Sequence, residues 1–139
     1  MRILGIDYGD ARTGLAITDA LNITAQGLET IHNDGSDKVI LKKIDEILAQ
    51  YEIDTIVVGR PINMNGTESE RTIKTEKFIH KLKCKYNKIK IETIDERLTT
   101  VAAHKTMNFL DINKNKKKNI VDTISAVYIL ETYLNKIKN

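Results

Sequence analysis

The 139-residue sequence has one cysteine, one proline, no tryptophan and few aromatic residues, which make up 5% of the chain. A single cysteine, Cys84, excludes an internal disulfide and is typical of proteins in a reducing compartment. The three histidines are scattered, and together with one cysteine they do not make a zinc site. Because aromatic side chains are so scarce, the sequence gives little sign of a surface on which single-stranded bases would stack.

Long apolar runs are also missing from the sequence. No stretch approaches the ~20 apolar residues that cross a bilayer, and the amino terminus has the pattern of a strand rather than of a signal peptide. We therefore expect a cytoplasmic protein with no membrane partner. The composition is otherwise ordinary, with 41% hydrophobic and 29% charged residues, and the length favours one domain over residues 1–139.

The net charge of +3 conceals an uneven distribution along the chain. Residues 1–70 carry six Lys and Arg against twelve Asp and Glu, whereas residues 71–139 carry sixteen against seven. The basic half could supply a surface for a polyanion. Within it, KNKKKN (114–119) is predicted to be a cationic loop that binds phosphates without reading sequence, through Lys114, Lys116, Lys117 and Lys118. A solvated, lysine-rich surface is the alternative interpretation.

Hydrophobic patterning predicts secondary structure in the order β-β-β-α-β-α-β-α-α. Strands are expected over residues 2–7, 14–19, 23–31, 53–58 and 88–94. Helices are expected from the turn at 34–37 to about residue 51, and over about 70–86, 99–108 and 120–137. The second helix should turn Ile73, Phe78, Ile79 and Leu82 inward. An antiparallel start followed by alternating helices and strands predicts an α/β fold, with a mixed five-stranded sheet flanked by helices.

Four acidic residues stand at the ends of these elements: Asp7, Asp95, Glu96 and Asp122. Ligands of open α/β sheets gather outside the carboxyl ends of the strands, so these side chains would converge if the first and last strands lie near each other. Converging carboxylates repel one another unless a cation neutralises them, and Mg²⁺ or Mn²⁺ best suits oxygen ligands. Such ions assist phosphodiester hydrolysis.

Each acid also has an ordinary structural interpretation. Asp7 could simply begin a turn, the pair Asp95 and Glu96 could bind nearby lysines, and Asp122 fits a capping box at the start of the last helix. Adjacent strand residues point to opposite faces, so Asp95 and Glu96 should not both face one metal unless the strand has already ended. Between the two we favour Glu96, with Asp95 close behind.

Arginines accompany the acids along the chain. Arg12 lies in the same turn as Asp7, Arg60 follows the fourth strand, and Arg97 follows Glu96 directly. Arginine binds phosphate through two parallel hydrogen bonds, so these residues are candidate contacts to a nucleic-acid backbone. Turn residues with surface arginines are the alternative.

Four motifs follow one another along the chain: GIDYGDARTGLA (5–16), VVGRPINMNGTESER (57–71), IDERLTT (94–100) and VDTISAVYILETYL (121–134). Together they resemble the YqgF, or RuvX-like, family of pre-16S rRNA nucleases and Holliday-junction-resolvase-like proteins, nearly from end to end. The resemblance implies an RNase H-like fold and metal-dependent phosphodiester hydrolysis. It also implies that Asp7, either Glu96 or Asp95, and Asp122 are catalytic metal ligands. Arg12, Arg97, Thr99 and Thr100 fall within matching motifs, whereas Arg60 and the basic loop depart from the family pattern.

The leading hypothesis from this resemblance is a Mg²⁺- or Mn²⁺-dependent nuclease that matures the 5′ end of pre-16S ribosomal RNA. Its expected partner is the rRNA precursor or a ribosomal particle, and the protein should be a monomer or weak dimer. One alternative is resolution of branched DNA, which needs a dimer with two sites. Another is a non-catalytic nucleic-acid-binding factor in ribosome assembly or transcription. DYGDARTG (7–14) also resembles the phosphate loop of actin-like ATPases, but those enzymes need two such domains.

Overall fold

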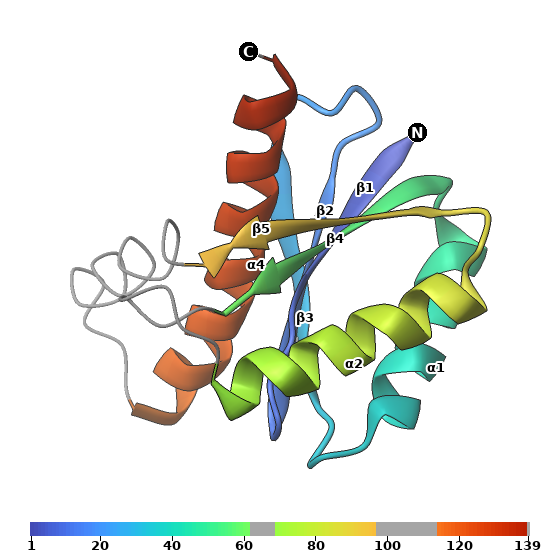
Figure 1. Cartoon of the computed structure of the whole chain (residues 1–139). Helices are drawn as coiled ribbons and strands as arrows, with labels where there is room; N and C mark the ends of the chain where they lie inside the picture. The colour runs from blue at the N-terminus through green and yellow to red at the C-terminus, as the bar shows by residue number, and fades with distance from the viewer. Residues whose placement is uncertain (62–68, 97–113, 139) are drawn as a thin grey trace.

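The first three strands form an antiparallel meander, as the sequence predicts (Figure 1). The computed structural model describes residues 1–61, 69–96 and 114–138, with side chains from residue 123 onward in the last range. Strand β1 (Arg2–Asp7) pairs with β2 (Arg12–Thr18), and β2 pairs in turn with β3 (Ala25–His32).

Two parallel strands complete a five-stranded sheet in the order β3-β2-β1-β4-β5. Strand β4 (Ile53–Arg60) lies beside β1, and β5 (Lys90–Asp95) lies beside β4. Helix α1 (Asp37–Gln50) precedes β4, and α2 (Glu70–Lys85) lies between β4 and β5 in the chain. The predicted α/β fold with a mixed sheet flanked by helices is therefore confirmed. The first and last strands are not adjacent, because β4 separates them.

Helices cover both faces of the sheet. On one face, Ile44 of α1 and Phe78 of α2 join the core formed by the even-numbered apolar residues of β1. On the other face, helix α4 (Lys114–Lys138) packs on the sheet (Figure 1) and contacts all five strands. It packs closely because Gly5 has no side chain: a Cβ there would lie 2.5 Å from Leu130 Cγ, inside the van der Waals limit.

Two details of the sequence prediction are wrong. The expected cationic loop at 114–119 is helical, since α4 begins at Lys114; lysine has an unbranched side chain that loses little freedom in a helix. Ile73 is 50% exposed, because α2 buries Thr72 and Thr75 in that turn and Phe78, Ile79 and Leu82 further on. The helix expected at 99–108 lies outside the described residues.

In the part of the chain that the structure describes, no helix combines the length and the apolar character needed to cross a membrane.

Candidate active site

Two buried acids lie at the carboxyl-terminal rim of the parallel strands. Asp7 is the last residue of β1 and Glu96 follows β5 directly, and their exposed fractions are only 8% and 7%. Side chains alternate along a strand, so Asp7 shares a face with Ile3, which packs under α4. Ile94 packs in the same cluster, two residues before Glu96. Both acids therefore belong to the α4 side of the sheet.

Gly59 makes room for the Glu96 side chain on the intervening strand β4. A Cβ at position 59 would lie 2.7 Å from Glu96 Oε1 and 2.8 Å from Glu96 Cγ. It would also lie 2.5 Å from Ile129 Cδ1 of α4. Any side chain at this position would have to push away the carboxylate, the helix, or both.

Arg71 places one positive charge beside both carboxylates. Its Nη2 atom is 3.7 Å from Asp7 Oδ1 and 3.8 Å from Glu96 Oε2. The two carboxylate oxygens can therefore be no further apart than the sum of these two distances. The same Nη2 donates a long hydrogen bond of 3.4 Å to the carbonyl oxygen of Tyr8. The two acids thus meet at one rim although their strands are not neighbours.

The first turn of α2 positions this arginine. Ser69 and Thr72 form a capping box, in which each side chain accepts a hydrogen bond from the backbone N–H of the other residue. No role is predicted for Arg71 from the sequence, although it is the last residue of the motif VVGRPINMNGTESER (57–71). Its place in the first turn of a predicted helix, after a glycine-containing loop, was the available signal.

A hollow of about 290 Å³ opens beside Asp7. Two arginines, Arg12 and Arg71, line it together with the turn that follows β1, and the full lining is Asp7, Tyr8, Gly9, Asp10, Ala11, Arg12 and Arg71. The predicted phosphate-binding residue Arg12 therefore shares one cavity with the predicted metal ligand Asp7. Two arginines that line one hollow suit a phosphate group.

Hydrogen bonds from the end of β3 hold the turn that carries Arg12. Asn33 is buried, and its Nδ2 donates to the carbonyl oxygens of Gly9 and Asp10 at 3.1 and 3.0 Å. Its Oδ1 accepts from Thr13 Oγ1 at 3.0 Å. Gly9 is required here, since a Cβ at that position would lie 2.2 Å from the carbonyl oxygen of Arg12.

Tyr8 anchors the turn on the opposite face of the sheet from Asp7. Its ring stacks on Phe78 with 4.3 Å between centroids, and its hydroxyl donates to Asp37 Oδ1 at 2.7 Å. Lys81 Nζ is 2.8 Å from the other oxygen of Asp37. Burial first, and then the hydrogen bond to Asp37, raise the pKa of Tyr8 above its ordinary value, so the hydroxyl remains protonated. Tyr8 therefore acts as a structural anchor.

Helix α4 approaches the rim from the β3 side. Gly14 of β2 pairs with Asp7 on one side and with Thr30 on the other, so these three residues form one row across the sheet. The hydroxyl of Thr123 in α4 is 2.8 Å from that of Thr30. Asp122, the predicted fourth acid, is the residue before Thr123 in α4, and its side chain lies outside the described part.

Asp95 and Arg60 belong to the other side of the sheet. They are register partners at the ends of β5 and β4. Asp95 directly precedes Glu96 and Arg60 directly follows Gly59, so strand alternation points both to the opposite face. Arg60 Nε forms an ion pair with Glu76 of α2, the helix that covers that face. Strand alternation thus separates Asp95 from the side of Asp7 and Glu96.

The remaining predicted nucleic-acid contacts are not described at the level of side chains. Arg97 and Thr99 lie outside the described residues, as does Thr100 of the same motif. The backbone of α4 includes the four lysines of KNKKKN, Lys114, Lys116, Lys117 and Lys118, and the positions of their side chains stay predictions.

The donor set at the rim fits a hard divalent cation. Asp7 and Glu96 offer carboxylate oxygens in a nine-tenths buried setting, and Mg²⁺ is commonly held by one or two carboxylates together with water and substrate phosphates. Among the residues described, no group of three or more His, Cys, Asp and Glu side chains comes together as a metal site. The two carboxylates are thus the candidate ligands that this part of the chain offers.

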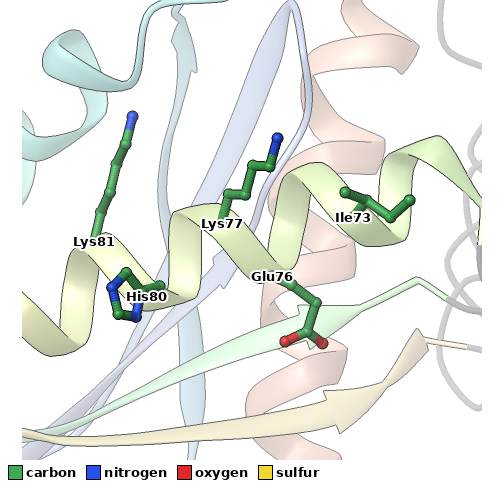
Figure 2. Close-up of a pocket in the computed structure, with 5 residues that line it drawn as sticks. All are labelled: Ile73, Glu76, Lys77, His80 and Lys81. Carbon is green, nitrogen blue, oxygen red and sulfur yellow. The ribbon is translucent and has the colours of Figure 1, made fainter.

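A second hollow lies on helix α2 (Figure 2). It is lined by one helix, through Ile73, Glu76, Lys77, His80 and Lys81. Figure 2 shows Lys77 and Lys81 extending to one side of the helix and Glu76 to the other. This hollow does not contain the paired carboxylates, so the rim is the better candidate for catalysis.

The sheet order, with helices on both faces and the long helix α4 across one of them, defines an RNase H-like fold. Solved structures match this fold over nearly the whole chain. The fowlpox virus Holliday junction resolvase has a TM-score of 0.59 at 15% identity, covering 99% of each chain. RuvC of Thermus thermophilus, in complex with a Holliday junction, also has a TM-score of 0.59, at 12% identity, covering 98% of this chain and 96% of that chain.

Sequence relatives are much closer than these structures. A family model described as "RuvX: Holliday junction resolvase" matches residues 1–136. A protein of Ruminiclostridium cellulolyticum, named "Putative pre-16S rRNA nuclease", is 54% identical over 99% of this chain and 96% of its own. One of the same name from Acetivibrio thermocellus is 52% identical over 96% of this chain and 95% of its own. The chain belongs to the RuvX family, as its four motifs indicate.

Proposed function

We propose that this RuvX-family protein is a divalent-metal-dependent nuclease that hydrolyses a phosphodiester bond in the 5′-end maturation of pre-16S ribosomal RNA. The substrate follows from the relatives named as pre-16S rRNA nucleases. The protein acts in the cytoplasm, on the rRNA precursor or a ribosomal particle. The observation that carries the chemistry is the pair of buried carboxylates, Asp7 and Glu96, which lie 3.7 and 3.8 Å from the same nitrogen of Arg71.

Each residue of the rim has a role in this proposal. Asp7 and Glu96 hold Mg²⁺ or Mn²⁺, which when bound supplies Lewis-acid polarisation of the scissile phosphate. Arg12, in the turn after β1, binds the non-bridging phosphate oxygens through hydrogen bonds. Gly59 keeps Glu96 in position, and Asn33 keeps the turn rigid, so the phosphate meets a preorganised site.

Asp122 is proposed as the third acid at the rim. It precedes Ala126 by four residues and Ile129 by seven, a spacing that puts the three positions on one side of α4. Ala126 and Ile129 are fully buried against the sheet. The bond between Thr123 and Thr30 ties the start of this segment to the cross-strand row that ends at Asp7.

The direct test is cleavage of purified pre-16S rRNA by the wild-type protein and by Asp7→Asn. The substitution removes a negative charge but little volume, so the protein should fold normally while its cleavage rate falls about a hundredfold or more. Cleavage should need Mg²⁺ or Mn²⁺ and stop in EDTA. The matched control is Asp54→Asn, which removes the same charge from an exposed residue at the opposite end of β4.

Assays on a four-way DNA junction, run in parallel, separate RNA maturation from junction resolution. Preferred cleavage of the branched DNA would reassign the substrate while leaving the site intact. Salt-sensitive RNA binding in EDTA, with no metal-dependent product on either substrate, would point instead to a non-catalytic binding factor. Full activity of Asp7→Asn would refute the proposed site.

A further inference from the structure

Two buried carboxylates at one rim repel each other, and the guanidinium of Arg71, which lies close to both, offsets part of that repulsion. We propose that Arg71 is an exchangeable counter-ion of this site. It offsets part of the negative charge of Asp7 and Glu96 in the metal-free protein, a divalent cation displaces it, and its freed guanidinium then binds the RNA phosphate. This inference rests on the proposed metal-dependent function and adds a second state to the same site.

The distances from Arg71 to the two carboxylates are short enough for electrostatic attraction but too long for hydrogen bonds. Arg71 Nη2 lies 3.7 Å from Asp7 and 3.8 Å from Glu96, whereas hydrogen-bonded pairs of this kind have about 2.7–2.9 Å between nitrogen and oxygen. Its hydrogen bond to the Tyr8 carbonyl is also long, at 3.4 Å. The guanidinium is therefore held mainly by charge, and a doubly charged cation competes directly for the same two carboxylates.

The side chain can leave without disturbing the core. Arg71 is 53% exposed, whereas the side chains of Asp7 and Glu96 are 10% and 9% exposed. The helix that carries Arg71 is anchored separately, by the Ser69–Thr72 capping box and by buried residues further along α2. Rotation of one arginine about its own side-chain bonds thus exchanges the counter-ion, while both acids stay in place.

The freed guanidinium can bind substrate in the hollow beside Asp7. Arg71 lines the 290 Å³ hollow that Arg12 also lines, next to Asp7. With its charge no longer offset by the acids, Arg71 joins Arg12 as a second phosphate ligand. Metal binding therefore does two things at once: it fills the carboxylate pair and releases a cation for the substrate.

Calorimetric titration of Mn²⁺ into RNA-free protein tests the first step. Arg71→Met keeps the length of the side chain and removes the competing charge, so Mn²⁺ should bind about tenfold more tightly than to wild type. Arg71→Lys keeps a charge and should stay closer to wild type. Lys77→Met, on the exposed side of the same helix, removes the same charge elsewhere and should leave the affinity unchanged.

Thermal unfolding gives an independent readout of the same step. In EDTA, Arg71→Met leaves two buried carboxylates without this cation, so its Tm should fall below that of Lys77→Met by several degrees. Saturating Mn²⁺ should abolish the difference. If Arg71→Met is unfolded in EDTA, Arg71→Lys supplies the comparison, with a smaller loss of Tm that Mn²⁺ again removes.

RNA binding tests the second step. With saturating Ca²⁺ in place of Mg²⁺, Arg71→Met should bind pre-16S rRNA about tenfold more weakly than wild type, because a charge-assisted phosphate contact is lost. In EDTA the two proteins should bind RNA with nearly equal affinity. An equal loss with and without metal would overturn the exchange, since Arg71 would then be a permanent phosphate contact.

The possible failures are distinguishable. If wild type binds Mn²⁺ but Arg71→Met binds it no more tightly, only the counter-ion role is overturned and the metal-dependent nuclease stands. If wild type binds no Mn²⁺, both the counter-ion and the metal-dependent function are overturned. Tighter Mn²⁺ binding by Lys77→Met as well would show a general charge effect and would also overturn the specific role of Arg71.

Discussion

Glu96 rests against the bare backbone of Gly59, on the strand that separates it from Asp7. A methyl group at position 59 would come within 2.7 Å of Glu96 Oε1 and 2.5 Å of Ile129 Cδ1. This glycine therefore determines where the second carboxylate of the rim can lie, although it contributes no functional group itself.

Gly59→Ala should displace Glu96 and lower activity with a moderate loss of stability. Overpacking costs about 1–3 kcal/mol, and a shift of about 1 Å in a catalytic group costs up to about a hundredfold in rate. The matched control is Gly5→Ala, which crowds Leu130 of α4 in the same way without touching Glu96. Urea unfolding and Mn²⁺ titration of both variants provide the measurement. Equal Mn²⁺ affinities in the two would contradict the role given to Gly59.

A second prediction separates the two adjacent acids. Glu96→Gln should weaken Mn²⁺ binding about tenfold or more, because it removes a carboxylate ligand on the α4 side of the sheet. Asp95→Asn should change the affinity less than about threefold, since strand alternation puts Asp95 with Arg60 on the other side. Mn²⁺ titration of both variants decides the matter. A larger loss in Asp95→Asn would reverse the assignment.

The lysines at the start of α4 should set the salt dependence of RNA binding. Replacing Lys114, Lys116, Lys117 and Lys118 by Gln keeps helix-forming residues and removes four charges. On single-stranded RNA, the slope of log affinity against log salt should become shallower by up to about 3. A paired substitution of the exposed α1 residues Lys38 and Lys42 by Gln should leave the slope nearly unchanged. A steep slope in the quadruple variant would show that RNA binds elsewhere.

Stability at alkaline pH should reflect two buried tyrosines. Burial, followed by hydrogen bonds to Asp37 and Asp45, raises the pKa of Tyr8 and of Tyr86 respectively. Both groups stay protonated in the folded state when the unfolded chain ionises near pH 10. Stability should therefore be retained below about pH 10 and fall above it, by at most about 1.4 kcal/mol per pH unit for each retained proton.

The double variant Tyr8→Phe/Tyr86→Phe checks this prediction. It should be less stable than wild type at pH 8, by roughly 1–3 kcal/mol for each hydrogen bond lost to a carboxylate. Between pH 9.5 and 11 it should lose less stability than wild type, because these two protons are no longer retained. Urea unfolding across this range gives both values, and parallel curves for the two proteins would contradict the assignment.

The sequence predicts most of the fold because its signals are local. Alternation and apolar runs mark the strands, and Ile44 and Phe78 lie on the buried faces of their helices as the spacing indicates. Local patterns fail where packing against other elements determines which residues are buried. Ile73 fits the apolar stripe of α2, yet this turn buries Thr72 and Thr75 instead. Likewise, helix α4 begins at Lys114, although the charged segment 114–119 is predicted to be a loop.

The acids Asp7 and Glu96, and the turn arginine Arg12, could be selected from the sequence because strand ends and turns are where α/β folds gather chemistry. For Arg71 the sequence offers only its place in the first turn of a predicted helix, which does not indicate that its guanidinium reaches two carboxylates on strands that are not neighbours. The close approach of Glu96 and Ile129 to Gly59 likewise leaves no pattern in the sequence. Backbone hydrogen bonding and burial repeat every few residues and leave a pattern along the chain, whereas encounters between distant side chains arise only when the helices pack on the sheet.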